Sequence, residues 1–289
     1  MKKYSAVLLL VLASAFWGFT FVFQSKAAQI IGPFSYNGIR MLIGALVLSP
    51  FAAKSIRKNR SNKDYKPALT KGGLLCGLLI AAASVTQQYG IGFTTAGQAG
   101  FITSLYYLFV PVFSIALGKK VSFGLWLCVF TGLAGALLLS TGSESGVMGT
   151  GEALLFVCAV LFALQIMVID HYCTIIDGPD ISCIQFLTGG ILCLVCGLIF
   201  ETVTWEIIRA AAIPILYAGI CSCGIAYTLQ IVGQKYIQPT KATLILCLES
   251  FWAAAGGALV LGETMSAREI TGCVLILAAA MVSQLLRKN

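Results

Sequence analysis

Long apolar stretches separated by short polar segments are the dominant pattern of this chain. Each stretch has close to the ~20 residues that an α-helix needs to cross a lipid bilayer. The longest polar segment, residues 54–71, is too short to form a soluble domain. The pattern predicts an all-α integral membrane protein. Ten transmembrane helices are expected, over residues 4–26, 33–53, 72–92, 97–117, 122–141, 150–170, 181–200, 210–232, 241–262 and 267–286.

Composition agrees with this prediction. Hydrophobic residues make up 58% of the chain and charged residues only 10%, whereas a soluble domain carries about 25% charged residues. A soluble enzyme, a disordered chain and a nucleic-acid-binding protein are therefore disfavoured, and the lipid bilayer is the expected surrounding. The first apolar stretch continues past Ala13-Ser14-Ala15 to Phe23, so it is expected to be an uncleaved helix rather than a signal peptide.

The basic residues predict how the chain is oriented in the membrane. The net charge is +8, and with ten helices and Lys2 and Lys3 inside, 15 of the 19 Lys and Arg residues fall in inner segments. This distribution follows the positive-inside rule. We expect a multi-pass protein of the cell (inner) membrane with both termini cytoplasmic; an organellar membrane is the alternative. The outer connections carry Glu144, Glu201, Glu206, Glu263 and Glu269 instead.

The cysteines do not form a recognisable metal or redox motif. Most of the 11 cysteines lie inside apolar stretches, and Cys193-x-x-Cys196 has no second pair near it. His171 is the only histidine. Buried cysteine behaves as a small hydrophobic residue, so no metal site and no cofactor are expected.

A weak internal repeat divides the chain. Residues 90–106 align with residues 233–249 at an offset of 143, with Gln87 opposite Gln230 and Tyr106 opposite Glu249. Five helices per copy is an odd number, so the second copy enters the membrane from the opposite side. The repeat predicts two inverted five-helix units, residues 1–143 and 144–289, an arrangement typical of secondary transporters. The alternative is a duplication retained only for the stability of the bundle.

Short motifs in both halves support a family resemblance. They are Phe16-Trp17-Gly18, Ile39-Arg40, the Gly-x-x-aromatic-x-x-x-x-x-Ala hairpins starting at Gly90 and Gly233, Leu248-Glu249-Ser250 and Leu261-Gly262-Glu263. On these motifs the whole chain resembles the EamA-type ten-helix carriers of the drug/metabolite transporter superfamily. Family members often have proline where Ser250 stands, while Pro111 is kept and is expected to be a hinge or a static kink. The resemblance implies a central cavity lined mainly by helices 1, 3, 4, 6, 8 and 9, and relatives that export amino acids and other small metabolites.

Polar side chains within the apolar stretches are the candidate site, because polar groups in a membrane face the protein interior or a water-filled cavity. Glu249 is expected to bind a substrate amine or carry a coupling proton, with a buried structural anchor as the alternative. Arg40 is expected to pair with Glu249 or to be the counter-charge for a substrate carboxylate, with snorkelling to the interface as the alternative. For the whole set, hydrogen bonding between helices is the alternative role. The expected substrate-binding residues are Trp17, Gln24, Gln87, Gln88, Tyr106, Gln165, Tyr227, Gln230, Glu249 and Trp252.

The repeat and the resemblance together predict a secondary transporter, not an enzyme. It is expected to move an amino acid or a similar polar organic solute across the cytoplasmic membrane by alternating access, in the direction of export. Because the sequence has no G-x-x-x-x-G-K-[ST] run, a proton gradient or exchange is the expected energy source. The alternatives are an intramembrane enzyme, which lacks an H-E-x-x-H motif, and a non-transporting membrane subunit or channel. The sequence does not indicate an oligomeric state.

Overall fold

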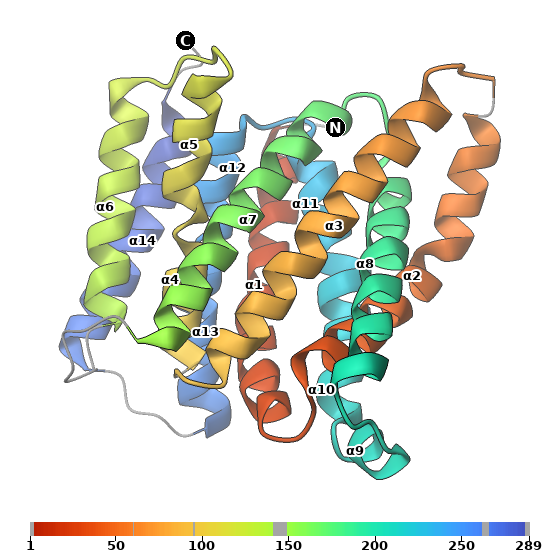
Figure 1. Ribbon diagram of the computed structural model, residues 1–289. Coiled ribbons are helices and arrows are strands. Elements are labelled where there is room, and N and C mark those ends of the chain that lie inside the picture. The colour runs from red at the N-terminus through yellow and green to blue at the C-terminus, as the bar shows by residue number, and fades with distance from the viewer. Residues whose placement is uncertain (1–2, 60, 95, 141–148, 262–265, 287–289) are drawn as a thin grey trace.

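All the regular elements of the computed structural model are helices (Figure 1). The structure describes residues 3–59, 61–94, 96–140, 149–261 and 266–286. The helices of the first half are α1 (Lys3–Ala28), α2 (Pro33–Lys58), α3 (Tyr65–Ile91), α4 (Ala96–Ser104), α5 (Tyr106–Ala116) and α6 (Phe123–Ser140). Those of the second half are α7 (Thr150–Tyr172), α8 (Gly178–Phe200), α9 (Trp205–Ala210), α10 (Ala212–Tyr217), the π-helix η1 (Ala218–Ala226), α11 (Tyr227–Gln234), α12 (Pro239–Leu246), α13 (Leu248–Leu261) and α14 (Ala267–Leu285).

The all-helical membrane fold is confirmed. Among the described residues, 7 helical spans are long and apolar enough to cross a membrane, counting Ala96–Ala116 and Ala212–Gln234 as one span each. Two shorter apolar helices, Phe123–Leu138 and Ile270–Leu285, coincide with the fifth and tenth predicted stretches. The ninth is divided between α12 and α13. The count of ten membrane crossings therefore stays a prediction, although each predicted stretch is mostly helical over its described residues.

Two predicted helix ends were wrong by more than a turn. α2 continues to Lys58 instead of ending at residue 53, and α3 begins at Tyr65 instead of residue 72. Hydropathy marks only the part of a helix that lies in hydrocarbon. Backbone hydrogen bonding continues through the charged residues beyond that part, so both helices extend past the apolar layer.

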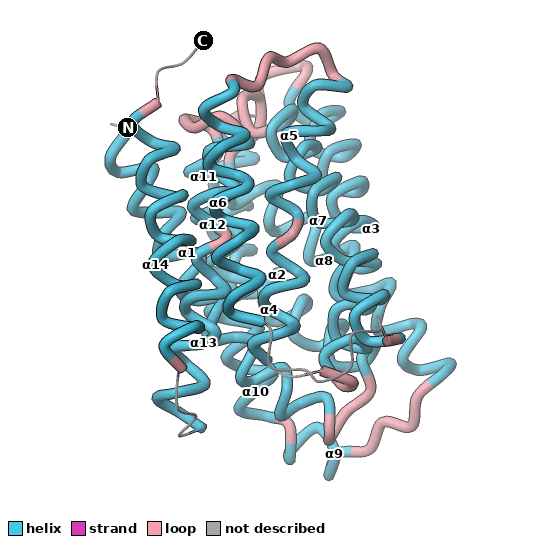
Figure 2. Tube along the Cα trace, turned by 90° about the vertical axis from the view of Figure 1, so that its left-hand side faces the viewer, coloured by secondary structure: helices cyan, strands magenta, loops and turns pink. Residues whose placement is uncertain are grey.

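The long helices run between the two ends of the bundle, where most connections lie, and α2 and α3 are strongly tilted relative to α6 and α8 (Figures 1 and 2). Both ends of the chain lie at the same end of the bundle; α1 runs away from that end and α7 runs towards it (Figure 1). Contacts between the halves occur in corresponding pairs. α2 packs against α8 and α6 against α14, while α3 packs against α7 and α1 packs against η1 and α11. Exchanging the two halves therefore reproduces the same set of neighbours.

Glycines allow two pairs of helices to approach closely, α2 with α8 and α1 with α13. A Cβ atom on Gly38 of α2 would lie 2.7 Å from the backbone nitrogen of Leu194 in α8. A Cβ atom on Gly18 of α1 would lie 2.7 Å from the carbonyl oxygen of Glu249 in α13. Small residues at such contacts allow membrane helices to pack without a hydrophobic driving force between them. The predicted boundary at residues 143/144, like Glu144 and Glu263, lies outside the described residues.

Candidate functional site

A small central cavity lies between the two halves. Its free volume is about 30 Å³, and its walls come from α1, α2, α3, α4, α5 and α7 together with η1, α11 and α13. Arg40 lines it, as do most of the residues expected to bind substrate. The latter are Trp17, Gln24, Gln87, Tyr106, Gln165, Tyr227, Gln230 and Glu249.

Two expected residues do not line the cavity. Gln88 lines a separate surface hollow formed by residues 28–33 and the end of α3. Trp252 packs its ring against Phe251, with 4.9 Å between ring centroids. Gln88 directly follows Gln87, so its side chain points about 100° around α3 from the cavity-lining one. Trp252 lies three residues after Glu249 on the same face of α13, but its Cβ atom faces Gly18 of α1.

Three glutamine amides form a hydrogen-bonded cluster between the cavity and the surface hollow. Gln24 Nε2 donates to Gln87 Oε1 at 3.0 Å and to Gln88 Oε1 at 3.2 Å. Gln88 Nε2 donates in turn to the backbone carbonyl of Gln24 at 3.0 Å. We call Gln24, Gln87 and Gln88 the amide cluster; it joins α1 to α3 at the end of the bundle opposite the termini.

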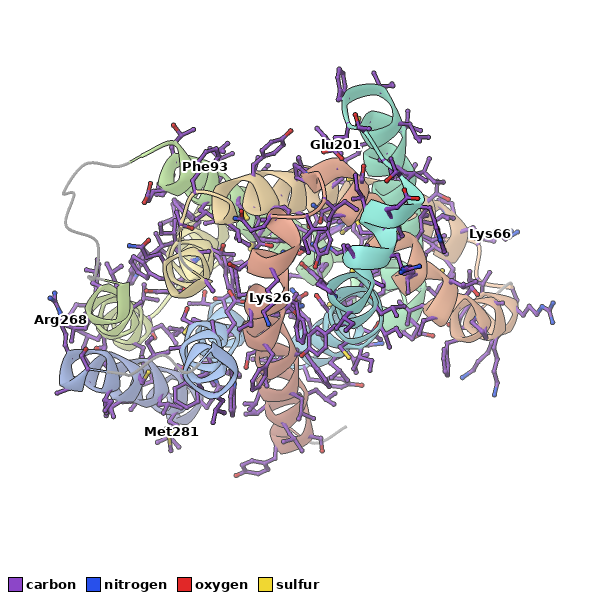
Figure 3. All side chains as sticks on the ribbon, turned by 90° about the horizontal axis from the view of Figure 1, so that it is seen from below. Lys26, Lys66, Phe93, Glu201, Arg268 and Met281 are labelled. Carbon is purple, nitrogen blue, oxygen red and sulfur yellow. The ribbon has the colours of Figure 1, made fainter. Side chains whose placement is uncertain are left out.

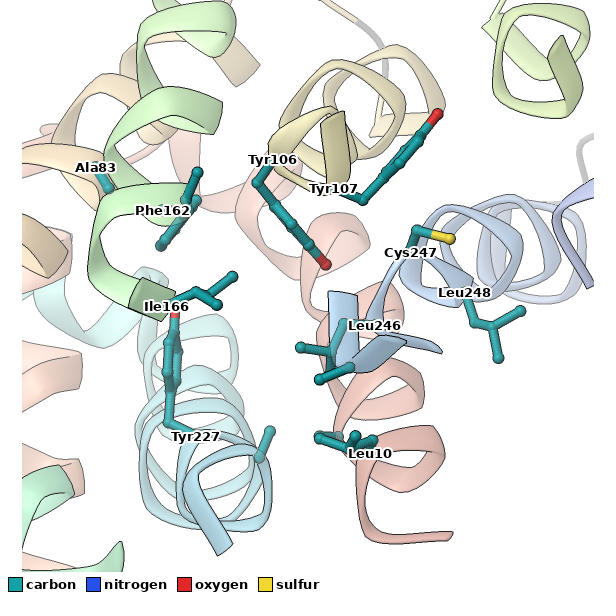
Figure 4. Close-up of a cluster of buried hydrophobic side chains, with 14 of the residues drawn as sticks. Leu10, Ala83, Tyr106, Tyr107, Phe162, Ile166, Tyr227, Leu246, Cys247 and Leu248 are labelled. Carbon is teal, nitrogen blue, oxygen red and sulfur yellow. The ribbon is translucent and has the colours of Figure 1, made fainter. Parts of the chain in front are cut away.

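Aromatic rings form another part of the cavity wall. The ring centroids of Trp17 and Tyr227 lie 4.6 Å apart, with 59° between the ring planes. The ring of Phe186 packs against Tyr227 in an edge-to-face arrangement, with 5.2 Å between centroids. Tyr106 points into the space between the helix that carries Tyr227 and the segment that carries Leu246, whereas its neighbour Tyr107 points away (Figure 4). This part of the wall is therefore apolar, beside the polar groups of the amide cluster.

One cationic and one anionic side chain face this cavity. Arg40 is only 2% exposed, its Nε donates to Asn37 Oδ1 at 2.8 Å, and its guanidinium lies 5.4 Å from the Tyr36 ring centroid. Asn37 is itself fixed because its amide donates to two backbone carbonyls. Glu249 is 3% exposed. In the part of the chain that the structure describes, the single ion pair is Lys119–Asp170, so the expected pair between Arg40 and Glu249 is not formed.

Several polar atoms around the cavity have no hydrogen-bond partner within the protein. Leaving a buried polar group unpaired costs about 1–3 kcal/mol, so a group of them at one place is unusual for a structural core. A polar ligand would supply the missing partners. The atoms are Trp17 Nε1, Tyr106 Oη, Gln165 Oε1, Gln230 Oε1 and Glu249 Oε1.

Helix irregularities occur next to the charged and polar residues. The fourth predicted helix is interrupted at Leu105, directly before Tyr106, and the ninth at Cys247, two residues before Glu249. The interruption is not at Pro111, which lies within α5. The eighth contains the π-helix η1, whose Ser222 lines the cavity. Interrupted helices are typical of transporter binding sites, and π-helical turns are frequent at functional sites.

The described residues contain no group of three or more His, Cys, Asp or Glu side chains that could hold a metal ion. Cys193 and Cys196 are free thiols, as are the other cysteines. The groups that the cavity presents are amides, hydroxyls, aromatic rings, one guanidinium and one carboxylate.

Comparison with known proteins identifies the family. The sequence profile described as the EamA-like transporter family matches the chain twice, over residues 4–141 and 149–284. The chain belongs to the EamA-like transporter family. The two matches correspond to the two halves of the bundle, which bears out the two-repeat architecture and the resemblance to the drug/metabolite transporter superfamily.

Relatives of this EamA-like protein are themselves named only as transporters. An "Uncharacterized transporter" of Archaeoglobus fulgidus is 28% identical, with 99% of this chain and 87% of the relative covered. The "Uncharacterized transporter YoaV" of Bacillus subtilis is 26% identical, with 90% of each chain covered. A solved structure described as "Crystal structure of protein" has a TM-score of 0.77 at 20% identity over 98% of each chain, which shows a shared fold. The EamA-like chain is thus a multi-pass membrane protein of a transporter family.

Sequence reasoning missed part of the wall of the EamA-like cavity. Most of the omitted residues lie three or four positions from residues that were found; Thr20, for example, lies on the same face of α1 as Trp17 and Gln24. Ile166 instead directly follows Gln165. Ser222 is different, because it lies in the π-helix, where the α-helical repeat does not apply. The missed residues are Thr20, Phe21, Thr103, Phe162, Ile166 and Ser222.

Ser250 also has a role in this EamA-like chain that its sequence position did not suggest. Its hydroxyl donates to the carbonyl of Gly100 at 3.2 Å and lies 3.0 Å from the hydroxyl of Ser104. A proline here would lack this hydroxyl. The serine therefore ties α13 to α4 directly beside Glu249.

Proposed function

We propose that the protein is a secondary transporter that exports an amino acid or a similar small polar solute across the cytoplasmic membrane. The observation that carries the proposal is the central cavity, where Arg40 from the first half and Glu249 from the second face one enclosed space without forming an ion pair. Two opposite charges that are buried and not paired with each other are costly unless a ligand pairs with them.

A solute that carries both a carboxylate and an ammonium group fits these charges. Arg40 would bind the carboxylate, because a guanidinium matches two carboxylate oxygens. Glu249 would bind the ammonium group. The rings of Trp17, Tyr106 and Tyr227 would contact the solute's side group. These three contacts come from both halves, so the solute would be bound only while the halves are together.

Alternating access is supported by the small size of the cavity. Ligand sites usually measure about 300–1,000 Å³, ten times or more the free volume of about 30 Å³ here. A metabolite therefore enters or leaves only when helices separate. On the face opposite the termini, the amide cluster stands between the cavity and a surface hollow of about 430 Å³, so opening on that face requires its hydrogen bonds to break.

The inverted relation of residues 1–143 and 144–289 is supported by two features. α1 and α7 run in opposite directions (Figure 1), and the contacts between the halves correspond when the halves are exchanged. In an inverted repeat the two halves exchange conformations, which opens the site first to one face and then to the other. The excess of basic residues at the end that carries both termini favours cytoplasmic termini in the inner membrane.

Energy coupling through Glu249 is part of the proposal. A buried carboxylate that is not ion-paired within the protein binds either a proton or a substrate cation, and these two states compete. Exchange of a proton for the solute at this one carboxylate would couple export to the proton gradient.

Flux into proteoliposomes tests the function. Purified protein is reconstituted and challenged with radiolabelled amino acids, amines and carboxylic acids under a pH gradient. A charge-assisted hydrogen bond contributes about 1.5–3 kcal/mol, so Glu249→Gln and Arg40→Gln are each expected to lower the flux on the order of tenfold or more. Glu206→Gln and Arg209→Gln, two exposed changes of the same chemistry on α9, are the matched controls.

Three results would contradict the proposal. Flux of no solute in the panel would remove its main support. Equal flux of solutes that carry only one of the two charges would refute recognition by both Arg40 and Glu249. A pH dependence unchanged in Glu249→Gln would remove Glu249 from the coupling role.

A further inference from the structure

A group of exposed cations lies where α2 ends and α3 begins, at the end of the bundle that carries both termini (Figure 1). Asp64 is the only acidic residue between positions 54 and 71. Figure 3 shows Lys66 at the edge of the bundle, whereas Lys26 lies near its centre. We call the following six residues the basic hairpin: Lys54, Arg57, Lys58, Lys63, Lys66 and Lys71.

The basic hairpin has no counter-charge of its own in the described structure. None of its six side chains forms an ion pair or a side-chain hydrogen bond among the described residues. This differs from Lys119 at the same end of the bundle, which pairs with Asp170. The nearby carboxylates Asp64, Asp177 and Asp180 form no ion pair with these six cations and are fewer than they are. The corner therefore keeps an excess of positive charge, which an external anion would stabilise.

Exposed apolar side chains continue directly from these cations on both helices. On α2, Phe51 is 63% exposed and lies three residues before Lys54. On α3, Leu75 and Leu78 are 44% and 52% exposed and lie four and seven residues after Lys71. Residues at these spacings share one helix face. Each helix thus presents a stripe that is cationic at the membrane surface and apolar deeper in the membrane.

We propose that the basic hairpin is a docking site for an anionic phospholipid of the phosphatidylglycerol type. Clusters of four to eight Lys and Arg residues directly outside a membrane helix attract anionic lipids, at about 1 kcal/mol per residue. The phosphate and its negative charge lie among the cations, and the acyl chains lie along Phe51, Leu75 and Leu78. A soluble anion would use only the cationic part of the stripe, so the apolar part favours a lipid.

The bound lipid stabilises a corner that joins the two halves. Ser55 Oγ and Asn59 Nδ2, on the last turn of α2 and just after it, donate to Asp177 Oδ2 at 3.0 and 3.1 Å. Tyr65, the first residue of α3, donates to Asp180 in α8. The basic hairpin is therefore tied to the start of α8, and a lipid that holds the hairpin also holds this contact. The inference requires only the membrane fold and not the proposed transport activity.

Electron paramagnetic resonance of spin-labelled lipids tests the site. The full-length protein is reconstituted in phosphatidylcholine vesicles that contain trace spin-labelled phosphatidylglycerol or phosphatidylcholine, and the motionally restricted fraction of each is compared. The wild type is expected to prefer phosphatidylglycerol. Because about 1 kcal/mol corresponds to roughly fivefold in binding, Lys63→Gln with Lys66→Gln is expected to lower this preference at least about fivefold. Salt at about 1 M, where the Debye length is about 3 Å, is expected to lower it as well.

The matched control removes two exposed lysines elsewhere on the same end of the bundle, Lys120→Gln with Lys235→Gln, and is expected to keep most of the preference. Equal losses in the two double variants would refute a localised site, and so would no loss in Lys63→Gln with Lys66→Gln. Displacement of the labelled lipid by about 10 mM inorganic phosphate would show a site for soluble anions and overturn the lipid proposal. Because every readout is lipid binding, failure here and failure of transport are distinguishable.

Discussion

The amide cluster makes a quantitative prediction about how the central cavity opens. Gln24→Leu replaces the amide with an apolar side chain of similar volume and removes the donor to Gln87 and Gln88. Two buried acceptors lose their partner in the closed state, whereas in an open state water reaches them. At about 1 kcal/mol for each of the two hydrogen bonds, and more where an acceptor stays unpaired, the closed state is expected to lose about 2 kcal/mol or more. The open population on that face should rise about 30-fold or more.

Chemical access to the cavity measures this population. Thr20 lines the cavity and is 2% exposed, so a Thr20→Cys probe should react slowly with a membrane-impermeant methanethiosulfonate reagent added on the side of residues 29–33. Adding Gln24→Leu is expected to raise the reaction rate by the factor above. The matched control, Gln165→Leu, removes the hydrogen bond from Gln165 to Gln185 at 3.1 Å, which lies within the second half. It should leave the rate from this side unchanged.

Two outcomes would refute the reasoning. An unchanged rate in Gln24→Leu would mean that the amide cluster does not hold that face closed. An equal rise in Gln165→Leu would mean that the loss of any buried amide loosens the bundle. Thermal unfolding of each variant is the second control. Loss of a buried hydrogen bond lowers the unfolding temperature in both variants, so a reaction rate that rises only in Gln24→Leu, at a comparable unfolding temperature, reports opening of that face and not general destabilisation.

Three further predictions concern stability, each read from thermal unfolding in detergent. Glu201→Ala removes the carboxylate that accepts hydrogen bonds from the Phe34 and Ser35 backbone N–H groups at 2.8 Å, and is expected to lower the free energy of unfolding by about 2 kcal/mol. The exposed control Glu206→Ala should lower it by about 0.5 kcal/mol or less, and equal losses would contradict a capping role for Glu201. Gly38→Ala forces α2 away from α8 and is expected to lower the free energy of unfolding by about 1–3 kcal/mol. Gly97→Ala, with no atom within 4 Å of its added Cβ, should leave it unchanged, and an unchanged stability of Gly38→Ala would show that the two helices are not in tight contact. Lys119→Gln breaks an ion pair whose lysine is 47% exposed, so the free energy of unfolding should fall by less than about 1 kcal/mol. A larger decrease would mean that this pair fixes the end of α7.

Hydropathy predicted where the helices lie because a bilayer admits few other structures. Every buried backbone group in hydrocarbon needs an internal partner, so an apolar stretch of this length becomes a helix. The same pattern could not predict where α2 and α3 end, since Lys58 and Tyr65 lie beyond the apolar layer. Nor could it predict the interruptions at Leu105 and Cys247. Both are ordinary helix-forming residues, and their conformations depend on packing against other helices.

The sequence predicted which residues line the cavity better than which of their polar groups bond to each other. Polar residues in apolar stretches must face the interior, and the intervals along each helix selected Trp17 with Gln24 and Tyr227 with Gln230 correctly as cavity-lining residues. Which polar groups meet each other depends on how the helices are arranged, which one helix cannot reveal. The sequence therefore suggested Arg40 as a partner of Glu249, whereas the structure has Arg40 hydrogen-bonded to Asn37 on its own helix.

The repeat has a consequence for the chemistry of the cavity. Positions that align across the halves, Gln87 with Gln230 and Tyr106 with Glu249, all line the same space. One pair is chemically identical and the other is not, because a neutral phenol in the first half corresponds to a carboxylate in the second. A conformational exchange between the halves would preserve the geometry of the wall but not its charge. Glu249 would then change its neighbours as each face opens, and no carboxylate in the first half would make the corresponding change. A Tyr106→Glu change, which makes the pair alike, should therefore alter the pH dependence of flux more than Tyr106→Phe does, and equal profiles would contradict this asymmetry.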